Sequence, residues 1–235
     1  MKIFVDSANI AEIEKWLRQG VVDGVTTNPS IMFKDGIYDV EDGARRIARL
    51  LGDRPLSVEV AGNDPQEMIR QGREFSAWAS NVVVKIPVAN EYGESCLGAV
   101  HSLHEEGIRV NATVILSFNQ AVLAAKAGAT YVSIFAGRVA DEGNDPAVVI
   151  RNVRHWLDDW NQPAEIIVGS VRAVIDIQNA ALAGAHIITV PPQFLPKMVD
   201  HRYTRETVRQ FNCDAEKALA QIAEARFAPH DGNGA

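Results

Sequence analysis

The segment Val82-Val83-Val84-Lys85-Ile86-Pro87 is an apolar, β-branched run with a single charge inside it. Near-continuous runs of Val and Ile are typical of parallel strands that are covered on both faces. A strand with one face in water would instead alternate apolar and polar residues. The segment therefore predicts a buried strand of a parallel sheet, and Lys85 is the one residue in it that packing does not explain.

Similar β-rich runs recur along the chain, and stretches with helical periodicity separate them. The strand-like runs cover Lys2–Asp6, Gly24–Thr27, Leu56–Val60, Val82–Ile86, Arg109–Val114, Tyr131–Phe135, Ile166–Ser170 and His186–Val190. The amphipathic stretches include Asn9–Gln19, Pro65–Ala79, Ser117–Lys126 and Ala173–Ala183. Asn9 and Asp64 are N-cap residue types ahead of two such stretches. Glycines stand where helices would end, at Gly20, Gly107, Gly128 and Gly184.

Eight strand–helix units in 235 residues give about 29 residues per unit, close to the ~250 residues of a (β/α)8 TIM barrel. The predicted fold is therefore α/β, a single-domain TIM barrel over residues 1–228 that includes an additional C-terminal helix over Arg202–Arg226. We expect this helix to pack beside the barrel or on a neighbouring subunit. Residues 229–235 are expected to form a disordered tail. A doubly wound open sheet is the alternative that the pattern leaves open.

Composition excludes several classes of partner. The net charge of −7 argues against nucleic acid or an anionic membrane, because both require a basic surface. A small anion remains compatible, since two well-placed arginines can bind a phosphate. Cys96 and Cys213 are far apart and in no metal-ligand spacing, so we expect reduced thiols, no metal site and no cofactor. Asp6 comes too early for a signal peptide, and no apolar stretch approaches the ~20 residues of a membrane span, so we expect a cytoplasmic protein.

In a TIM barrel, polar residues at the carboxyl ends of the strands form the active site, while apolar residues fill the interior. This rule selects Asp6, Thr26, Asn28, Glu59, Lys85, Asn111, Thr113, Ser133, Arg138, Ser170 and Arg172. Lys85 is the most informative of them, because burial favours the neutral amine, which can attack a carbonyl to form a Schiff base. A lysine paired structurally with Asp6 or Glu59, or one directed outward, is the alternative.

The other candidates have plain structural alternatives. Asp6 and Glu59 could exchange protons with a substrate hydroxyl or a trapped water, or serve as a helix cap or as the counter-ion of Lys85. The amides and hydroxyls at the strand ends could bind substrate hydroxyls or make ordinary loop hydrogen bonds. Arg138, Ser170 and Arg172 follow strands six and seven, where this fold often binds phosphate. Ion pairs between helices are the alternative for the two arginines.

Five segments together resemble the transaldolase family. They are Asp6-Ser7-Ala8-Asn9, Gly24-Val25-Thr26-Thr27-Asn28-Pro29-Ser30, Val83-Val84-Lys85-Ile86-Pro87, Ala124-Ala125-Lys126-Ala127-Gly128-Ala129-Thr130-Tyr131-Val132-Ser133 and Gly137-Arg138. The resemblance runs from residue 2 to about residue 215 and is strongest to the short bacterial and archaeal branch, which includes fructose-6-phosphate aldolase. It implies a metal-independent class I transaldolase that transfers a dihydroxyacetone unit from fructose 6-phosphate or sedoheptulose 7-phosphate to an aldose phosphate, as in the pentose phosphate pathway.

The resemblance also implies a role for each matching residue. Lys85 would form the Schiff base, and Asp6 would move the proton of the C4 hydroxyl. Glu59 and Thr113 would position a water that shuttles protons. Hydroxyls of the donor would be bound by Thr26, Asn28, Asn111 and Ser133. The sugar phosphate would be held by Arg138, Ser170 and Arg172. Rings of five or ten subunits are implied for the assembly.

Two positions distinguish transfer from simple cleavage within the family. Aldolase relatives carry Gln at the position of Glu59 and Tyr at that of Phe135, so the residues here favour a transaldolase. Ile134, Ala173-Val174 and Pro191-Pro192-Gln193 depart from the usual family residues, and the loop over residues 88–95 is longer than expected. An aldolase that releases free dihydroxyacetone, and a barrel that binds a sugar phosphate without catalysis, are the alternatives.

Overall fold

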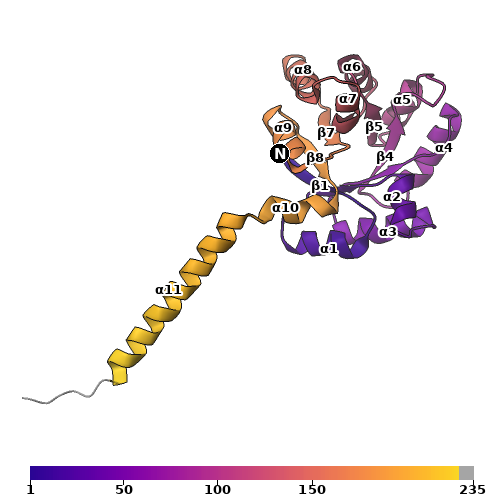
Figure 1. Ribbon diagram of the computed structural model, residues 1–235. Coiled ribbons are helices and arrows are strands. Elements are labelled where there is room, and N and C mark those ends of the chain that lie inside the picture. The colour runs from indigo at the N-terminus through magenta and orange to yellow at the C-terminus, as the bar shows by residue number, and fades with distance from the viewer. Residues whose placement is uncertain (228–235) are drawn as a thin grey trace, which may run out of the picture. The chain divides into compact units, whose positions relative to one another are not determined.

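The computed structural model describes residues 1–227 and contains a closed barrel of eight parallel strands (Figure 1). The strands follow one another around the barrel in chain order, and β1 closes it by pairing with β8. Their bounds are β1 Lys2–Asp6, β2 Gly24–Thr26, β3 Leu56–Glu59, β4 Val82–Pro87, β5 Val110–Ile115, β6 Tyr131–Phe135, β7 Glu165–Gly169 and β8 Ile187–Val190. The predicted (β/α)8 barrel is confirmed, and its closure excludes the open sheet.

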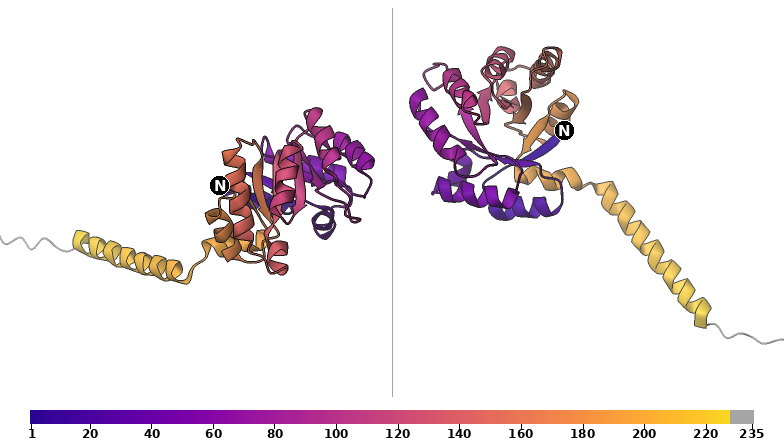
Figure 2. Two further views of the ribbon diagram at one scale, coloured as in Figure 1. Left: turned by 90° about the horizontal axis from the view of Figure 1, so that it is seen from above. Right: turned by 180° about the vertical axis from the view of Figure 1, so that it is seen from behind.

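Helices connect successive strands and lie outside the barrel (Figures 1 and 2). Their bounds are α1 Ile10–Arg18, α2 Pro29–Lys34, α3 Val40–Leu51, α4 Pro65–Ser76, α5 Leu97–Glu105, α6 Phe118–Lys126, α7 Ala136–Asp141, α8 Pro146–Asp159 and α9 Val174–Leu182. Two helices instead of one follow β2 and β6. The short members of these pairs, α2 and α7, are additions to the simple strand–helix repeat that the sequence predicts.

Local sequence explains where the helices begin and end. Side chains that accept from the first-turn backbone N–H groups are those of Asn9, Asn28, Asp39, Asp64, Ser117 and Asp145. The predicted caps Asn9 and Asp64 are therefore confirmed. The four glycines predicted at helix ends all have φ between 73° and 96°, the left-handed conformation that Gly adopts without steric cost.

The barrel interior is built in layers, because every second residue of a strand faces inward. One buried apolar cluster comprises Phe4, Val83, Tyr131, Ile167 and Ile187. Gly24 leaves room for the Phe4 ring, since a Cβ there would lie 2.7 Å from two ring carbons. Two residues further along the same strands stand Asp6, Lys85, Ser133, Gly169 and Thr189. The change from an apolar to a polar layer therefore occurs toward the carboxyl ends of the strands.

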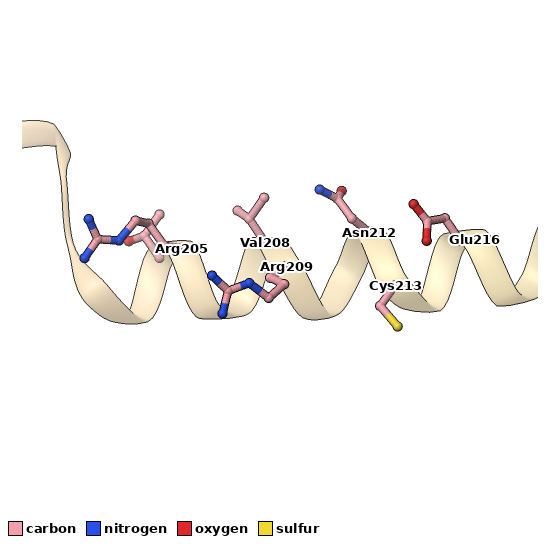
Figure 3. Close-up of a pocket in the computed structure, with 7 residues that line it drawn as sticks. Arg205, Val208, Arg209, Asn212, Cys213 and Glu216 are labelled. Carbon is pink, nitrogen blue, oxygen red and sulfur yellow. The ribbon is translucent and has the colours of Figure 1, made fainter.

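The chain divides into two compact units, Met1–Phe194 with the barrel and a second unit from Leu195 onward. In the second unit the structure describes α10 Leu195–Val199 and α11 Arg202–Phe227. All seven residues that line a hollow on this unit belong to α11, among them Arg205, Val208 and Glu216 (Figure 3). The predicted C-terminal helix is confirmed, whereas the predicted tail over 229–235 lies outside the described residues. Within residues 1–227, no helix combines the length and apolarity needed to cross a membrane.

Candidate active site

The polar layer at the carboxyl ends of the strands brings most of the predicted site residues together. Strand register places Glu59 beside Lys85, and Lys85 beside Asn111. On β1 and β2, which continue the barrel beyond β3, Asp6 is the register partner of Thr26. These residues come from β1 to β5, so the site depends on the closed barrel and not on any single loop.

Lys85 is buried, with 4% of its surface exposed. Its Nζ lies 2.9 Å from Glu59 Oε2 and donates a hydrogen bond to the backbone oxygen of Thr27 at 3.2 Å. The same nitrogen lies 5.9 Å from the centroid of the Phe135 ring. Lys85 is thus held inside the barrel, with one carboxylate, one carbonyl and one aromatic face around its amine. Of the two counter-ions that the sequence allows, the structure pairs it with Glu59.

Asp6 is held by a chain of hydroxyl groups. Thr26 Oγ1 donates to Asp6 Oδ1 at 2.7 Å, and Thr189 Oγ1 lies 2.5 Å from Thr26 Oγ1. Burial raises the pKa of Asp6, while the positive charge of Lys85 and the hydrogen bond from Thr26 oppose this shift. Thr189 is a site residue that the sequence analysis does not name. Its signal is the same as that of Lys85, a polar residue inside the apolar run of β8.

A second hydrogen-bond chain crosses the barrel from β6 to β3. Ser133 Oγ donates to Asn111 Oδ1 at 2.7 Å, and Asn111 Nδ2 donates to Ser57 Oγ at 3.1 Å. All three side chains are buried. The carboxamide of Asn111 is therefore fixed in orientation by its two neighbours. Ser57 is a further residue that the sequence analysis does not name, although it stands two positions before Glu59.

Thr113 has a hydroxyl that is buried without a hydrogen-bond partner among the described residues. The next residue, Val114, has φ 59°, which is an outlier for a β-branched side chain. The pairing of β5 with β6 shifts register between Ala112 and Ile115. Bulges of this kind re-aim side chains next to active sites. The bulge thus belongs to the same stretch of β5 that presents Thr113.

Asn28 has a structural role in addition to its place at the end of β2. Its Oδ1 accepts a hydrogen bond from Ile31 N at 2.8 Å and caps α2. Pro29 occupies the first position of this helix, where a missing N–H has no cost. The local hydrogen bond that the sequence leaves open as the alternative for Asn28 is therefore present, and it takes the form of a helix cap. Asn28 also lines a cavity of about 340 Å³ together with Thr27 and Glu59.

The predicted phosphate-binding residues lie around the ends of β6 and β7. Ser170 follows β7 with φ 57°, and its backbone oxygen accepts a hydrogen bond from Gly137 N at 3.1 Å. A side chain at position 137 would collide with this oxygen, so the approach requires glycine. Arg138 is exposed on α7. Gly137 therefore brings the start of α7 against Ser170.

Arg172 is partnered by carboxylates of the protein itself. Its Nη2 lies 2.6 Å from Asp141 Oδ2. The backbone N–H groups of Arg172 and Ala173 both donate to Asp176 Oδ2, at 2.9 and 2.8 Å. A guanidinium and the backbone N–H groups at the start of a helix are donors of the kind that bind anions. In this structure Asp141 contacts the guanidinium, and Asp176 accepts from the two N–H groups. Gly137, Arg172 and Asp141 also line a cavity of about 290 Å³ among α7, α8 and α9.

The long loop over residues 88–95 is an ordered turn organised by Asn90. Asn90 Oδ1 accepts from the backbone N–H groups of Tyr92 and Glu94, and its Nδ2 donates to the backbone oxygen of Asn63. Asn63 belongs to the loop that follows β3. The loops after β3 and β4 are therefore tied together, and Tyr92 is 71% exposed at the tip.

Comparison with known proteins finds similarity over nearly the whole chain. The transaldolase/fructose-6-phosphate aldolase family model matches residues 3–231. A protein of Listeria monocytogenes named probable transaldolase 2 is 43% identical over 216 residues, which cover 92% of this chain and 96% of that relative. A probable transaldolase of Dehalococcoides mccartyi is 41% identical over 214 residues, with coverage of 91% and 97%.

Solved structures with the same architecture include a mandelate oxidase variant, with a TM-score of 0.55 at 14% identity. The match covers 81% of this chain but only 63% of that one, so it concerns the barrel fold alone. The family model spans nearly the whole described chain, and the curated relatives match over nine tenths of its length. The chain belongs to the transaldolase/fructose-6-phosphate aldolase family.

Proposed function

We propose that the chain is a class I transaldolase that moves a dihydroxyacetone unit from a ketose phosphate to an aldose phosphate through a Schiff base on Lys85. The observation that carries this proposal is the buried amine of Lys85, 2.9 Å from Glu59 at the carboxyl end of the barrel. A buried amine beside a group that can accept its proton is the arrangement that nucleophilic catalysis by lysine requires.

The first step is addition of Lys85 Nζ to the C2 carbonyl of fructose 6-phosphate or sedoheptulose 7-phosphate. Lys85 gives a proton to Glu59, and the neutral amine adds to C2. The nitrogen then loses a proton while the former carbonyl oxygen gains one, which gives the carbinolamine. When the carbinolamine hydroxyl is protonated it leaves as water, and the lone pair of the nitrogen forms the C=N bond of the protonated imine, the iminium. The partnerless hydroxyl of Thr113 is suited to hold the water that carries protons between Glu59 and this oxygen.

The second step breaks the C3–C4 bond. Asp6 takes the proton of the C4 hydroxyl, the C4 carbon leaves as an aldehyde, and the electron pair of the broken bond enters the iminium to form an enamine. The raised pKa of Asp6 suits a base that must hold a proton and return it. In the reverse sense, the enamine adds to the carbonyl carbon of an acceptor aldehyde and Asp6 returns the proton to the new hydroxyl.

Substrate hydroxyls would be bound by the polar groups that surround these three residues. The fixed carboxamide of Asn111 and the hydroxyl of Ser133 face the layer that contains Lys85, and Asn28 lies at the end of β2. Thr26 would act through its hydrogen bond to Asp6. Arg138, Ser170 and Arg172 would hold the phosphate, with the guanidinium of Arg172 exchanging Asp141 for the ligand.

The second candidate function is an aldolase of the same fold, which would release free dihydroxyacetone. It is disfavoured by Glu59 and Phe135, since the sequence resemblance associates Gln and Tyr at these positions with aldolases. A barrel that only binds a sugar phosphate is disfavoured by the buried Lys85–Glu59 pair. Burying two charges costs stability, and binding alone does not need them inside the barrel.

Trapping with borohydride tests the proposal. The protein is incubated with fructose 6-phosphate or sedoheptulose 7-phosphate, reduced, digested and examined by peptide mass spectrometry. We expect a reduced three-carbon adduct on the peptide that contains Lys85, and none in a Lys85→Met variant. An unmodified Lys85 with both donors would contradict the mechanism, and a binding titration with the same sugars would then reveal a barrel that only binds them.

We also propose that the chain works as a homo-oligomer, as the sequence resemblance implies. Support comes from the apolar side chains that α11 exposes, which include Tyr203, Phe211 and Leu219. Light scattering during gel filtration checks this, and a monomer at micromolar concentration would contradict it. The cytoplasmic location stays a prediction.

A further inference from the structure

Thr189 is a buried hydroxyl in β8 that none of the roles proposed above uses. It is 5% exposed and stands in Ile187-Ile188-Thr189-Val190. Of the polar atoms in residues 1–227, Thr26 Oγ1 is its hydrogen-bond partner. A buried hydroxyl in an otherwise apolar strand costs stability unless its hydrogen bond is well made. Its placement beside the proposed base therefore calls for a chemical explanation.

The direction of the hydrogen bonds that link Thr189, Thr26 and Asp6 follows from counting the protons that each side chain can donate. Thr26 Oγ1 lies 2.7 Å from Asp6 Oδ1 and 2.5 Å from Thr189 Oγ1. A hydroxyl has one proton to donate and lone pairs to accept. When Asp6 is ionised, Thr26 must use its proton for the carboxylate, so the proton between the two threonines belongs to Thr189. Thr189 therefore donates to Thr26, and Thr26 donates to Asp6.

The methyl group of Thr189 lies against its neighbour on β7. A Cβ added at Gly169 would lie 3.4 Å from Thr189 Cγ2, which places the methyl group of Thr189 against the backbone of that glycine. With the methyl group on this side, Oγ1 is directed to Thr26. The hydrogen-bond chain therefore joins three strands, since Thr189 is on β8, Asp6 on β1 and Thr26 on β2.

We propose that Thr189 is a positioning residue for Asp6, which it serves by holding the hydroxyl of Thr26 as a donor to Oδ1. This inference rests on the proposed function, because it takes Asp6 as the base of the carbon–carbon bond step. With Oδ1 engaged, the exchanged proton is carried on Oδ2. The threonine chain thereby keeps one oxygen of the carboxylate aimed at the substrate hydroxyl.

Charged groups of both signs surround Asp6, so uncharged hydroxyl donors can stabilise its carboxylate without altering the balance of charge. Lys85 on β4 favours the ionised form of Asp6, whereas Glu59 on β3 and Asp35 after α2 disfavour it, as does burial. Asp35 is itself engaged by Ser7 Oγ and Ala8 N. The chain from Thr189 stabilises the carboxylate without adding a charge that would compete with Lys85.

A matched pair of substitutions tests the proposal. Thr189→Val keeps the shape and removes the hydroxyl, while Thr189→Ser keeps the hydroxyl and removes the methyl group. Turnover is measured against pH with fructose 6-phosphate and a four-carbon aldose phosphate, whose product is sedoheptulose 7-phosphate. For Thr189→Val we expect kcat to fall about tenfold with KM for the donor near that of the parent protein, and the acid limb to move to higher pH.

The sign of this pH shift follows from the contacts. Without the donor chain the ionised form of Asp6 loses stabilisation, so its pKa rises further and a higher pH is needed to ionise it. Thr189→Ser should retain most of the turnover and the parent pH profile. Equal impairment of the two variants, or parent-like turnover and pH profile in folded Thr189→Val, would overturn the proposal. If Thr189→Val does not fold, Thr189→Cys replaces it, since its thiol is a weak donor.

A double-substitution cycle checks that Thr189 acts through Thr26. If it does, Thr26→Val combined with Thr189→Val should be no slower than Thr26→Val alone. Additive losses of turnover from the two substitutions would show that Thr189 does not act through Thr26. Borohydride trapping on Lys85 separates this inference from the proposed function, because imine formation precedes the Asp6 step. Trapping should proceed in every variant, and its failure in the parent protein would instead refute the Schiff-base function.

Discussion

Lys85 Nζ lies 2.9 Å from Glu59 Oε2, and the two residues are direct register partners on β4 and β3. Their side chains are 5% and 16% exposed, so the pair is screened weakly by water. A pair of this kind contributes little net stability, but removal of one partner leaves an uncompensated buried charge. Glu59 therefore compensates the charge of the protonated amine, and it is also the adjacent group that can accept the proton when the amine reacts.

Glu59→Gln should slow imine formation on Lys85 by about a hundredfold or more, because the amine loses its proton acceptor. The rate of borohydride trapping with fructose 6-phosphate measures this step. The melting temperature should also fall, since the lysine is left buried without its counter-ion. Glu14→Gln is the control, because Glu14 pairs with Arg18 on the surface. Trapping by Glu59→Gln at the parent rate would show that another group accepts the proton.

Val114→Gly should separate stability from activity. A β-branched residue in the left-handed region costs about 1–2 kcal/mol, and glycine forfeits about 0.5–1 kcal/mol of backbone entropy. Because Val114 is 37% exposed, removal of its side chain also forfeits about 1 kcal/mol of apolar burial, so stability should change by no more than about 1 kcal/mol, while kcat falls because Thr113 is held less firmly. Denaturant unfolding and initial rates measure the two effects.

Asn161→Gly is the matched control for this substitution. Asn161 has φ 48° and lies in the connection from α8 to β7, at the opposite end of the strands from the candidate site. It should change stability little and leave kcat unaltered. Equal kcat in Val114→Gly and the parent protein would show that the bulge in β5 does not contribute to catalysis.

The strands and most polar residues of the site could be predicted from the sequence because their signals are local. Runs of Val and Ile mark each strand, and a charge within such a run marks Lys85. The hydroxyls of Ser57 and Thr189 could not be assigned, since one Ser or Thr in an apolar strand is also typical of ordinary packing. The conformation of Val114 was equally hidden, because β-branched residues favour extended backbone.

Asp141→Asn should strengthen binding of phosphorylated substrates. Its carboxylate forms an exposed ion pair with Arg172, so under the proposed function it would compete with the substrate phosphate for this guanidinium. Such pairs are worth up to about 1 kcal/mol, which corresponds to roughly a fivefold lower KM for fructose 6-phosphate. KM for unphosphorylated fructose should not change. Glu142→Gln removes a neighbouring exposed charge as the control, and equal effects of the two substitutions on KM would indicate a general electrostatic cause.

Asp6→Asn should stabilise the fold at neutral pH. Burial raises the pKa of Asp6 in the folded state, so ionisation costs folding free energy. The stability contributed by this group is fully present below its unfolded pKa and is lost as pH rises through the folded pKa. The melting temperature of Asp6→Asn should therefore exceed that of the parent at pH 7. The gain should shrink below about pH 4.

Asp158→Asn provides a control of opposite sign. The hydrogen bond from Arg154 lowers the pKa of Asp158, so its contribution is present above the unfolded pKa and is lost as pH falls through the folded pKa. Asp158→Asn should lower the melting temperature at pH 7 and have less effect in acid. A lower melting temperature for Asp6→Asn at pH 7 would show that its attraction to Lys85 outweighs burial.

Phe135→Tyr should convert part of the transfer activity into simple cleavage. Lys85 Nζ lies 5.9 Å from the centroid of the Phe135 ring, so a phenolic hydroxyl would stand near the enamine and could supply the proton that releases dihydroxyacetone. Release of free dihydroxyacetone from fructose 6-phosphate without an acceptor should rise, and an enzymatic assay for dihydroxyacetone measures it. Phe135→Leu, which adds no proton donor, should leave this release at the parent level. If Phe135→Tyr releases no more than Phe135→Leu, the aromatic position does not protect the enamine, and the choice of transfer over cleavage must lie with Glu59 or with the acceptor side of the site.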